Sequence, residues 1–189
     1  CEHTGDLACS SDMAARAAKR RQALETLLWN EELGAFADYD LRAGRVNSVL
    51  SAAALYPLFV GACQPAQGHR VAETIRARLL RAHGVVTTET ASGQQWDAPN
   101  GWAPLQWIAV RGLTAYGERA TADDIARRWM AANLALYQRE GRFVEKYDVE
   151  SAVAGEGGEY PTQDGFGWTN GVLRKLLVLY PTAPVQAAE

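Results

Sequence analysis

The chain has 189 residues, of which 48% are hydrophobic and 22% are charged, and its formal net charge at pH 7 is −3. These values are typical of a globular protein that is long enough for one domain with a substantial core. The small net charge, without a long basic run, argues against nucleic-acid binding. No stretch of about 18 uncharged apolar residues is present, which argues against a membrane span.

Cysteine and histidine are too few and too scattered to predict a metal site or a bound cofactor. The three histidines, His3, His69 and His83, have no partners at ligand spacing. With three cysteines, at least one thiol is unpaired within the chain. Cys1 and Cys9 can pair if the protein is exported, although free or structural cysteines are the favoured interpretation.

The amino terminus does not resemble the start of a newly made protein. It has no initiator methionine, and it lacks the basic and apolar regions of a signal peptide. We therefore expect a processed or truncated piece of a longer protein. A poorly ordered segment is expected at 1–10, a folded domain at 11–182 and a flexible tail at 183–189.

Hydrophobic periodicity predicts six helices that alternate in character. Ser11 and Asp12 offer an N-cap for the first helix, and Thr121 with Asp124 gives the fifth a start similar to a capping box. The amphipathic helices are expected at 11–29, 66–82 and 121–140. The helices that are poor in charge are expected at 48–62, 103–116 and 170–180.

The connections between these helices alternate as well. Those that lead from an amphipathic to an apolar helix are long (30–47, 83–102 and 141–169), whereas the others are only a few residues. Antiparallel neighbours with such connections place every long loop at the same end of the assembly. The sequence therefore predicts an all-α fold of helical hairpins, with a site built from long loops on one rim.

A tryptophan-rich motif at 94–107 is the first candidate binding site. It contains three of the six tryptophans, and its two prolines and one glycine exclude a continuous helix through its first part. Flat aromatic faces beside hydrogen-bonding groups suit a sugar, which has apolar C–H faces and a rim of hydroxyls. A packing loop under the core is the alternative interpretation.

A second motif distinguishes these two interpretations. The run Glu145-Lys146-Tyr147-Asp148 is followed by a glycine-rich segment at 155–161 and by Gln-Asp-Gly-Phe-Gly-Trp-Thr-Asn-Gly at 163–171. Together, the two motifs resemble the C-terminal part of α,α-trehalases, which are glycoside hydrolases with an (α/α)6-barrel fold. The resemblance covers nearly the whole chain. Since such a barrel has six hairpins, the three expected here imply about half of it.

The resemblance also implies roles for individual residues. Glu145 matches the segment that carries the general base of these inverting enzymes, and Glu159 matches a carboxylate that contacts the substrate from a closing loop. Lys146, next to the base, is expected to be a solvated neighbour. The other side chains expected to contact or orient the sugar are Gln95, Trp96, Asp97, Asn100, Trp102, Phe166 and Trp168, with Gln94, Gln163 and Asp164 as weaker candidates.

The general acid of the family lies in a Gly-Trp-Asp motif, which this chain lacks. Asp97 follows Gln-Trp and does not replace it. An inverting glycosidase needs its acid and its base about 6.5–9.5 Å apart, with a water between the base and the sugar. We therefore expect no trehalose hydrolysis by this chain alone. The expected partners are trehalose or glucose and the missing N-terminal half of the barrel, with no cofactor, metal, nucleic acid or membrane.

Two other functions are compatible with the sequence. One is an (α/α)6-barrel glycosidase that acts on a different glucoside, because a fold does not determine its substrate. The other is a helical-hairpin module that binds without catalysis, although the three hairpins share no repeated sequence. The residues of both motifs are closer to those of bacterial periplasmic trehalases than to those of cytoplasmic ones.

Overall fold

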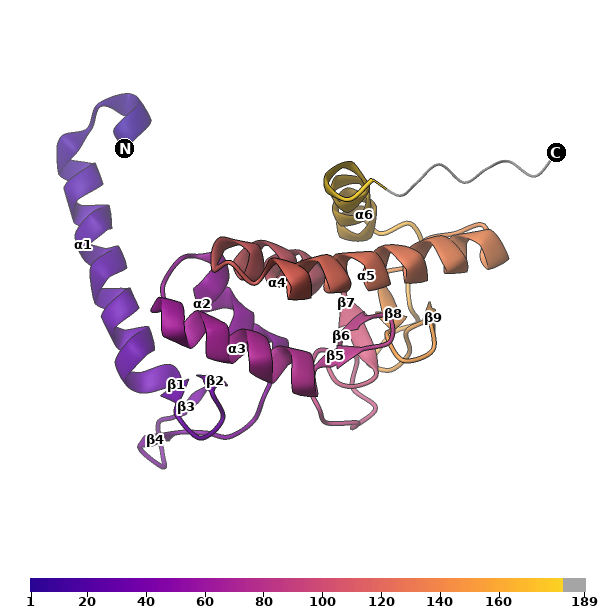
Figure 1. Cartoon of the computed structure of the whole chain (residues 1–189), viewed down its shortest axis with the longest axis horizontal. Helices are drawn as coiled ribbons and strands as arrows, with labels where there is room; N and C mark the ends of the chain where they lie inside the picture. Colours follow the sequence, from indigo (N-terminus) through magenta and orange to yellow (C-terminus); the bar gives the residue numbers. More distant parts are fainter. Residues whose placement is uncertain (182–189) are drawn as a thin grey trace.

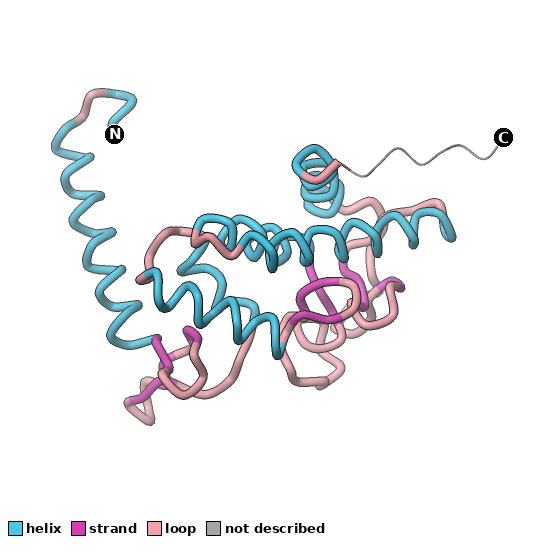
Figure 2. The backbone as a smooth tube through the Cα atoms, in the orientation of Figure 1, coloured by secondary structure: helices cyan, strands magenta, loops and turns pink. Residues whose placement is uncertain are grey.

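The computed structural model describes residues 1–181, so the predicted tail at 183–189 lies outside the described residues. Helices form most of the body, and short strands lie between them (Figures 1 and 2). The predicted all-α fold is therefore confirmed in its helical character, but short strands are also present. Buried backbone N–H and C=O groups must form hydrogen bonds, and in the long connections they do so by pairing into short strands. Strands of two or three residues are too short to show a period of two in the sequence.

The helical elements are η1 (Glu2–Thr4), α1 (Leu7–Ala23), the π-helical turn η2 (Leu24–Leu28), η3 (Ala52–Leu55), α2 (Tyr56–Phe59), α3 (Pro65–Arg78), α4 (Ala103–Ala115), α5 (Arg119–Glu140) and α6 (Gly167–Leu179). The strands are β1 (Trp29–Asn30), β2 (Ala35–Phe36), β3 (Tyr39–Asp40), β4 (Arg45–Val46), β5 (Leu80–Arg81), β6 (Gly84–Val85), β7 (Asn100–Trp102), β8 (Lys146–Asp148) and β9 (Val153–Ala154). They form three hairpins, β1–β2, β3–β4 and β5–β6, and one sheet in the order β7-β8-β9.

The first helix begins earlier than predicted. Asp6, rather than Ser11 or Asp12, is the N-cap of α1, because its side chain accepts a hydrogen bond of 2.9 Å from the backbone N–H of Cys9. Helical structure then continues through η2 to Leu28, close to the predicted end.

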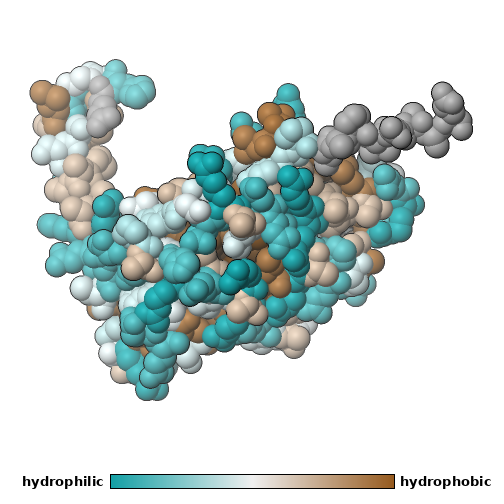
Figure 3. Space-filling view, viewed as in Figure 1, coloured by the Kyte–Doolittle hydropathy of each residue, from teal (hydrophilic) through white to brown (hydrophobic). Residues whose placement is uncertain are grey.

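The segment before α1 is held by a disulfide between Cys1 and Cys9. The favoured prediction of free cysteines is therefore wrong for this pair, whereas Cys63 is free. No residue of α1 is buried, and the helix stands apart from the rest of the body (Figure 1). On the face shown in Figure 3, α1 is mostly pale to brown, whereas hydrophilic side chains dominate over the body.

The helix predicted at 48–62 is shorter than expected, because only residues 52–59 are helical. Residues 48–50 form neither helix nor strand, and only the short elements η3 and α2 follow. Pro57 explains the break, because it lacks an N–H and is tolerated only in the first turn of a helix, where it lies in α2. Leu55 and Leu58 are buried, but Tyr56 and Val60 are exposed. Burial on all sides was therefore also a wrong prediction.

The other four predicted helices are confirmed within a few residues. α5 begins at Arg119 rather than Thr121, and no side chain caps its first turn. Gly117 follows α4 with φ +85°, and Gly141 ends α5 with φ +70°. Only glycine adopts this left-handed conformation without a steric cost, which is why both helices stop there.

Helix α4 is the centre of the core. It packs along α5 and also against α2 and α6 (Figure 1). Gly112 permits the close approach of α2, since a Cβ atom there would lie 3.0 Å from the backbone nitrogen of Phe59. Leu113 of α4 and Trp129 of α5 are fully buried. Burial of each such large side chain stabilises the fold by about 1.5–3 kcal/mol.

The three long connections are joined to one another through backbone pairing. In the β7-β8-β9 sheet, Trp102 lies opposite Lys146, so the two sequence motifs are neighbours in space. An isolated bridge between Ser51 and Thr88 joins the first long connection to the second. The buried side chain of Gln106 then anchors this region to α4: its amide accepts from the N–H of Val85 at 2.8 Å and donates to the carbonyl of Val85 at 2.7 Å.

No helix within residues 1–181 combines the length and the apolar character needed to cross a bilayer.

Candidate active site

Glu145 lies at the junction of the two motifs, immediately before β8. Its backbone N–H donates to the carbonyl of Gln163 at 2.8 Å, and its own carbonyl accepts from the indole N–H of Trp168 at 3.2 Å. The buried hydroxyl of Thr169 donates to the carbonyl of Val144 at 2.8 Å. Because the loop before α6 and the first turn of α6 hold the backbone on both sides of the residue, the direction of the Glu145 side chain is well defined.

The carboxylate of Glu145 is 2% exposed and has a partner on each oxygen. Oε2 lies 3.2 Å from Nζ of Lys146, and Oε1 accepts a hydrogen bond of 2.9 Å from the hydroxyl of Tyr160. This contact, together with partial burial, raises the pKa of the Tyr160 hydroxyl above its usual value, because ionised tyrosine would face the carboxylate.

Lys146 is fully buried, so the prediction of a solvated neighbour is wrong. Its ammonium group lies 5.5 Å from the ring centroid of Trp102 and 5.4 Å from that of Tyr160. The pairing of β7 with β8 places the lysine stem against the Trp102 ring. This burial depends on contacts far apart in the sequence, and the local pattern did not show it.

Four of the predicted aromatic residues form one cluster. The rings of Trp96 and Trp102 are stacked, Trp102 meets Trp168 edge to face at 5.6 Å, and Trp168 contacts Phe166 at 4.6 Å. The indole N–H of Trp102 donates to the carbonyl of Gln95 at 3.0 Å. The structure therefore brings Trp96, Trp102 and Trp168 together, with Trp102 beside Lys146 and Trp168 beside Glu145.

Asp97 is bound by its own loop. Its Oδ1 accepts a hydrogen bond of 2.8 Å from the hydroxyl of Thr88, and its Oδ2 accepts one from the hydroxyl of Ser92. Both carboxylate oxygens therefore have partners within the segment 88–97, which favours a role in shaping the loop.

Asn100 connects the two long loops. Its side-chain amide donates to the carbonyl of Gln95 at 3.2 Å and to the carbonyl of Glu156 at 2.7 Å. Among the described residues, the buried side-chain oxygens of Asn100 and Gln95 have no hydrogen-bond partner. An unpaired buried amide oxygen costs about 1–3 kcal/mol, so both groups are suited to receive a hydroxyl donor.

The remaining predicted residues are more peripheral. Glu159 is exposed, and its side chain makes no hydrogen bond or ion pair with any residue in 1–181. Asp164 is paired with Arg142 at 2.6 Å, and Gln163 contributes its backbone carbonyl to Glu145. Gln94 is exposed.

Within residues 1–181, no three histidine, cysteine, aspartate or glutamate side chains are grouped so that they could hold a metal ion.

The similarity of this chain to known proteins identifies its family. The model of the family described as Trehalase matches residues 1–181. The chain belongs to the trehalase family.

Named relatives agree with this assignment. The chain is 52% identical over 181 residues to the periplasmic trehalase of Pseudomonas aeruginosa. This alignment covers 95% of this chain and 33% of that protein. It is also 52% identical over 183 residues to the periplasmic trehalase of Xanthomonas campestris, and this alignment covers 96% of this chain and 32% of that protein. This trehalase-family chain therefore spans about a third of the length of the curated relatives it matches.

Two solved structures are similar to this trehalase-family chain. The neutral trehalase of Saccharomyces cerevisiae matches with a TM-score of 0.75 and 30% identity, over 89% of this chain and 30% of that chain. The mannosylglycerate hydrolase of Thermus thermophilus, in complex with glucose, matches with a TM-score of 0.62 and 28% identity, over 84% and 38%. Both neighbours are helical glycosidases.

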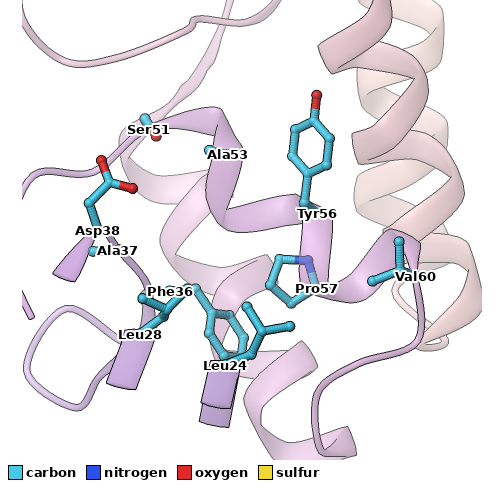
Figure 4. A pocket seen from close by; sticks show the side chains of 10 residues that line it. All are labelled: Leu24, Leu28, Phe36, Ala37, Asp38, Ser51, Ala53, Tyr56, Pro57 and Val60. Carbon is cyan, nitrogen blue, oxygen red and sulfur yellow. The ribbon is translucent and has the colours of Figure 1, made fainter. Parts of the chain in front are cut away.

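The surface of this trehalase-family chain has two hollows that are not lined by Glu145. The first is an apolar groove of about 350 Å³, lined by residues of η2, β2 and α2 that include Leu24, Leu28, Phe36 and Pro57 (Figure 4). It contains none of the predicted site residues. The second is a hollow of about 340 Å³ between the segments 93–100 and 153–157, and it includes Gln94 and Asn100.

Sequence reasoning missed Tyr160 as a partner of Glu145. The segment Gly-Gly-Glu-Tyr-Pro drew attention to Glu159, the charged residue, but the neighbouring tyrosine is the one that reaches the carboxylate. A signal was present, because a tyrosine between glycine-rich and proline-containing segments is an unusual residue for a purely flexible loop.

Proposed function

We propose that this chain is the C-terminal third of a longer α,α-trehalase, which hydrolyses trehalose to two glucose molecules with inversion at the reacting carbon. The observation that carries the proposal is the buried carboxylate of Glu145, which is hydrogen-bonded on both oxygens at the edge of a tryptophan cluster. The relatives that are named trehalases support the substrate.

Glu145 is the general base in this proposal. It takes a proton from a water molecule, the water oxygen bonds to the anomeric carbon, and the bond from that carbon to the bridging oxygen breaks. The bridging oxygen leaves with the second glucose after it receives a proton from a general acid. Since the chain has no Gly-Trp-Asp motif, we place the acid in the remainder of the longer protein.

The loop residues then divide into two groups. The exposed ring of Trp96 and the buried amide oxygens of Gln95 and Asn100 support contact with the sugar. The remaining members contact or orient the substrate from the same loops. They are Asp97, Trp102, Glu159, Phe166 and Trp168.

The longer protein also explains the uncovered apolar surface. α1 has no buried residue, and the groove of Figure 4 is lined by the half-buried Leu24 and Leu28 and the exposed Val60. We infer that the α-helices α1–α6 and their connections form about half of an (α/α)6 barrel and that the other half covers these faces. An apolar groove of this kind is otherwise unfavourable on a free surface.

We also propose a periplasmic location. The relatives that are 52% identical are named periplasmic trehalases. The Cys1–Cys9 disulfide supports this location, because such bonds persist in oxidising compartments.

Substitution of Glu145 by Gln in the full-length protein tests the proposal. The amide cannot accept a proton, so kcat on trehalose should fall by at least about a thousandfold while the protein stays folded. Glu150→Gln is the matched control: Glu150 lies on the same loop with an exposed side chain, so its rate should stay within twofold. Equal rates for the wild type and Glu145→Gln would refute a catalytic role and favour a non-catalytic binding module.

The identity of the base and the stereochemistry can be tested together. In Glu145→Ala, added azide should restore turnover, because it attacks without needing a base, and the product should be the β-glucosyl azide. With the wild type, proton NMR should show equal first amounts of α- and β-glucose. Two α-glucose molecules would contradict inversion.

The isolated chain should not hydrolyse trehalose, whereas the full-length protein should. Rapid turnover by residues 1–189 alone would refute our placement of the acid. A second candidate substrate class is suggested by the structural match to a mannosylglycerate hydrolase. A full-length protein that prefers mannosylglycerate to trehalose would replace the substrate but retain the site.

A further inference from the structure

Lys146 is unusual because it is a lysine that is fully buried. Removal of an ammonium group from water costs several kcal/mol unless a charged partner and other favourable contacts replace the solvent. The carboxylate of Glu145 is that partner, with 3.2 Å between Nζ and Oε2. The rings of Trp102 and Tyr160 lie within 5.5 Å of Nζ and contribute cation–π attraction.

The position of Lys146 is determined by regular structure. It is the first residue of β8 and is paired with Trp102 of β7, which continues directly into α4. The carbonyl of Lys146 also accepts a hydrogen bond of 2.9 Å from the N–H of Gly155. The ammonium group therefore has little freedom to leave the carboxylate.

Tyr160 reaches the other oxygen from a different kind of segment. It follows Gly157 and Gly158, which have φ of +89° and +88°, and its side chain is 40% exposed. Its hydroxyl lies 2.9 Å from Oε1 of Glu145. Tyr160 is thus attached through a glycine-rich loop, whereas Lys146 is attached through a strand.

A general base must be open to the attacking water, and the side chain of Glu145 is only 2% exposed. The oxygen of the attacking water must lie within about 2.6–3.2 Å of a carboxylate oxygen. In this structure Lys146 holds Oε2 and Tyr160 holds Oε1. Each oxygen keeps a second lone pair, but at 2% exposure water cannot approach it until one of these two side chains moves aside. The loop residue is the one that can move at lower cost.

We propose that Lys146 and Tyr160 are positioning residues with different roles around Glu145. Lys146 stays on Oε2 throughout and keeps its positive charge beside the carboxylate, while Tyr160 occupies Oε1 only in the empty site and gives it up to the attacking water. The inference rests on the proposed role of Glu145 as the base.

The pH profile is the decisive measurement, because a merely structural role would not shift it. The titratable groups that contact Glu145 in the described part of the chain are Lys146 on β8 and Tyr160 on the loop before α6; Arg142 and Asp164 pair with each other nearby. A positive charge close to a carboxylate lowers its pKa by about 1–3 units. In the full-length protein, Lys146→Met should therefore move the acid limb of kcat/KM upward by at least one pH unit.

Two further lysine variants keep this test informative. Lys146→Arg retains the charge, so its acid limb should stay within about 0.3 pH unit of the wild type even if kcat falls. Lys175→Met removes an exposed lysine of α6 and should leave the profile unchanged. An unmoved acid limb in folded Lys146→Met would overturn the role of Lys146. If Lys146→Met does not fold, a shift of the acid limb by one pH unit or more in Lys146→Arg would overturn the role of Lys146 instead.

Tyr160→Phe tests the second role. The variant keeps the ring over Lys146 but removes the hydrogen bond that must break, so kcat/KM on trehalose should rise by about two- to tenfold. Tyr137→Phe, an exposed tyrosine that stacks on Phe143, is the matched control. A tenfold fall in kcat for Tyr160→Phe would show that the hydroxyl supports the reaction and would overturn this part of the proposal.

The outcomes separate the inference from the function beneath it. If Glu145→Gln is as active as the wild type, the function itself fails. If Glu145→Gln is inactive but the Lys146 and Tyr160 variants behave as their controls do, the function stands and only the positioning roles fail.

Discussion

The indole of Trp96 lies flat on the indole of Trp102, with 3.9 Å between the ring centroids and 6° between the planes. This spacing is a direct van der Waals contact, so no sugar ring fits between these two residues. Trp96 presents only its outer face, and 44% of the residue is exposed. The pair therefore offers one platform to a ligand and is not a clamp around it.

Substitution of each tryptophan by alanine should separate the two roles. Trp96→Ala should cost about 1 kcal/mol of unfolding free energy, the value of one aromatic pair, and raise KM by about tenfold. Trp102→Ala should cost about 3–5 kcal/mol because the residue is fully buried. Denaturant unfolding and Michaelis–Menten kinetics of the full-length variants measure both effects. Equal losses of stability would contradict the assigned roles.

Asp97 should act through its loop. Because its partners are the hydroxyls of Thr88 and Ser92, the double variant Thr88→Val/Ser92→Ala should raise KM as much as Asp97→Ala does, within about threefold. Combining all three substitutions should add little, since residues of one hydrogen-bond network are not additive. If Asp97→Ala is more than tenfold worse than the double variant, Asp97 contacts the substrate itself.

Gly155→Ala should disrupt the junction of the two loops. A Cβ atom there would lie 2.4 Å from Oδ1 of Asn100 and 3.1 Å from Cγ of Lys146, both of which are buried. Such overpacking costs about 1–3 kcal/mol, and we expect a corresponding fall in thermal midpoint together with a lower kcat. Gly171→Ala is the control, since nothing lies within 4 Å of its added Cβ in α6. It should be neutral or stabilising by up to about 1 kcal/mol.

Tyr147 should make the fold sensitive to high pH. Burial against Trp129 raises the pKa of Tyr147 from 10.0 to about 12. The folded state binds the proton of the Tyr147 hydroxyl more tightly than the unfolded state does, so this proton stabilises the fold fully below pH 10. As the pH rises from about 10 to 12, the free energy of unfolding should fall by about 3 kcal/mol in total.

The variant Tyr147→Phe isolates this effect. It loses the hydrogen bond of 3.3 Å from the N–H of Val144, so it should be about 1 kcal/mol less stable at neutral pH. Its unfolding free energy should then fall less steeply between pH 10 and pH 12 than that of the wild type. A difference between the two proteins that does not change with pH would contradict the assignment.

The sequence by itself determined the elements whose signals are local. The helices α3, α4, α5 and α6 follow from apolar residues at helical spacing, and Gly117 and Gly141 mark two of their ends because only glycine adopts a positive φ at no cost. The two motifs were also sufficient to identify the family and to select Glu145 and its tryptophans, because they are long and contain rare residues.

Only the tertiary structure decided the features that depend on pairing between distant segments. The register of β7 with β8 buries Lys146 beside Trp102, and the return of the glycine-rich loop brings Tyr160 onto Glu145. A separate, isolated bridge joins Ser51 to Thr88 where a longer helix was expected. In the β7–β8 pairing, such contacts join residues up to 48 positions apart along the chain, between Asn100 and Asp148, and no local pattern of polarity encodes them.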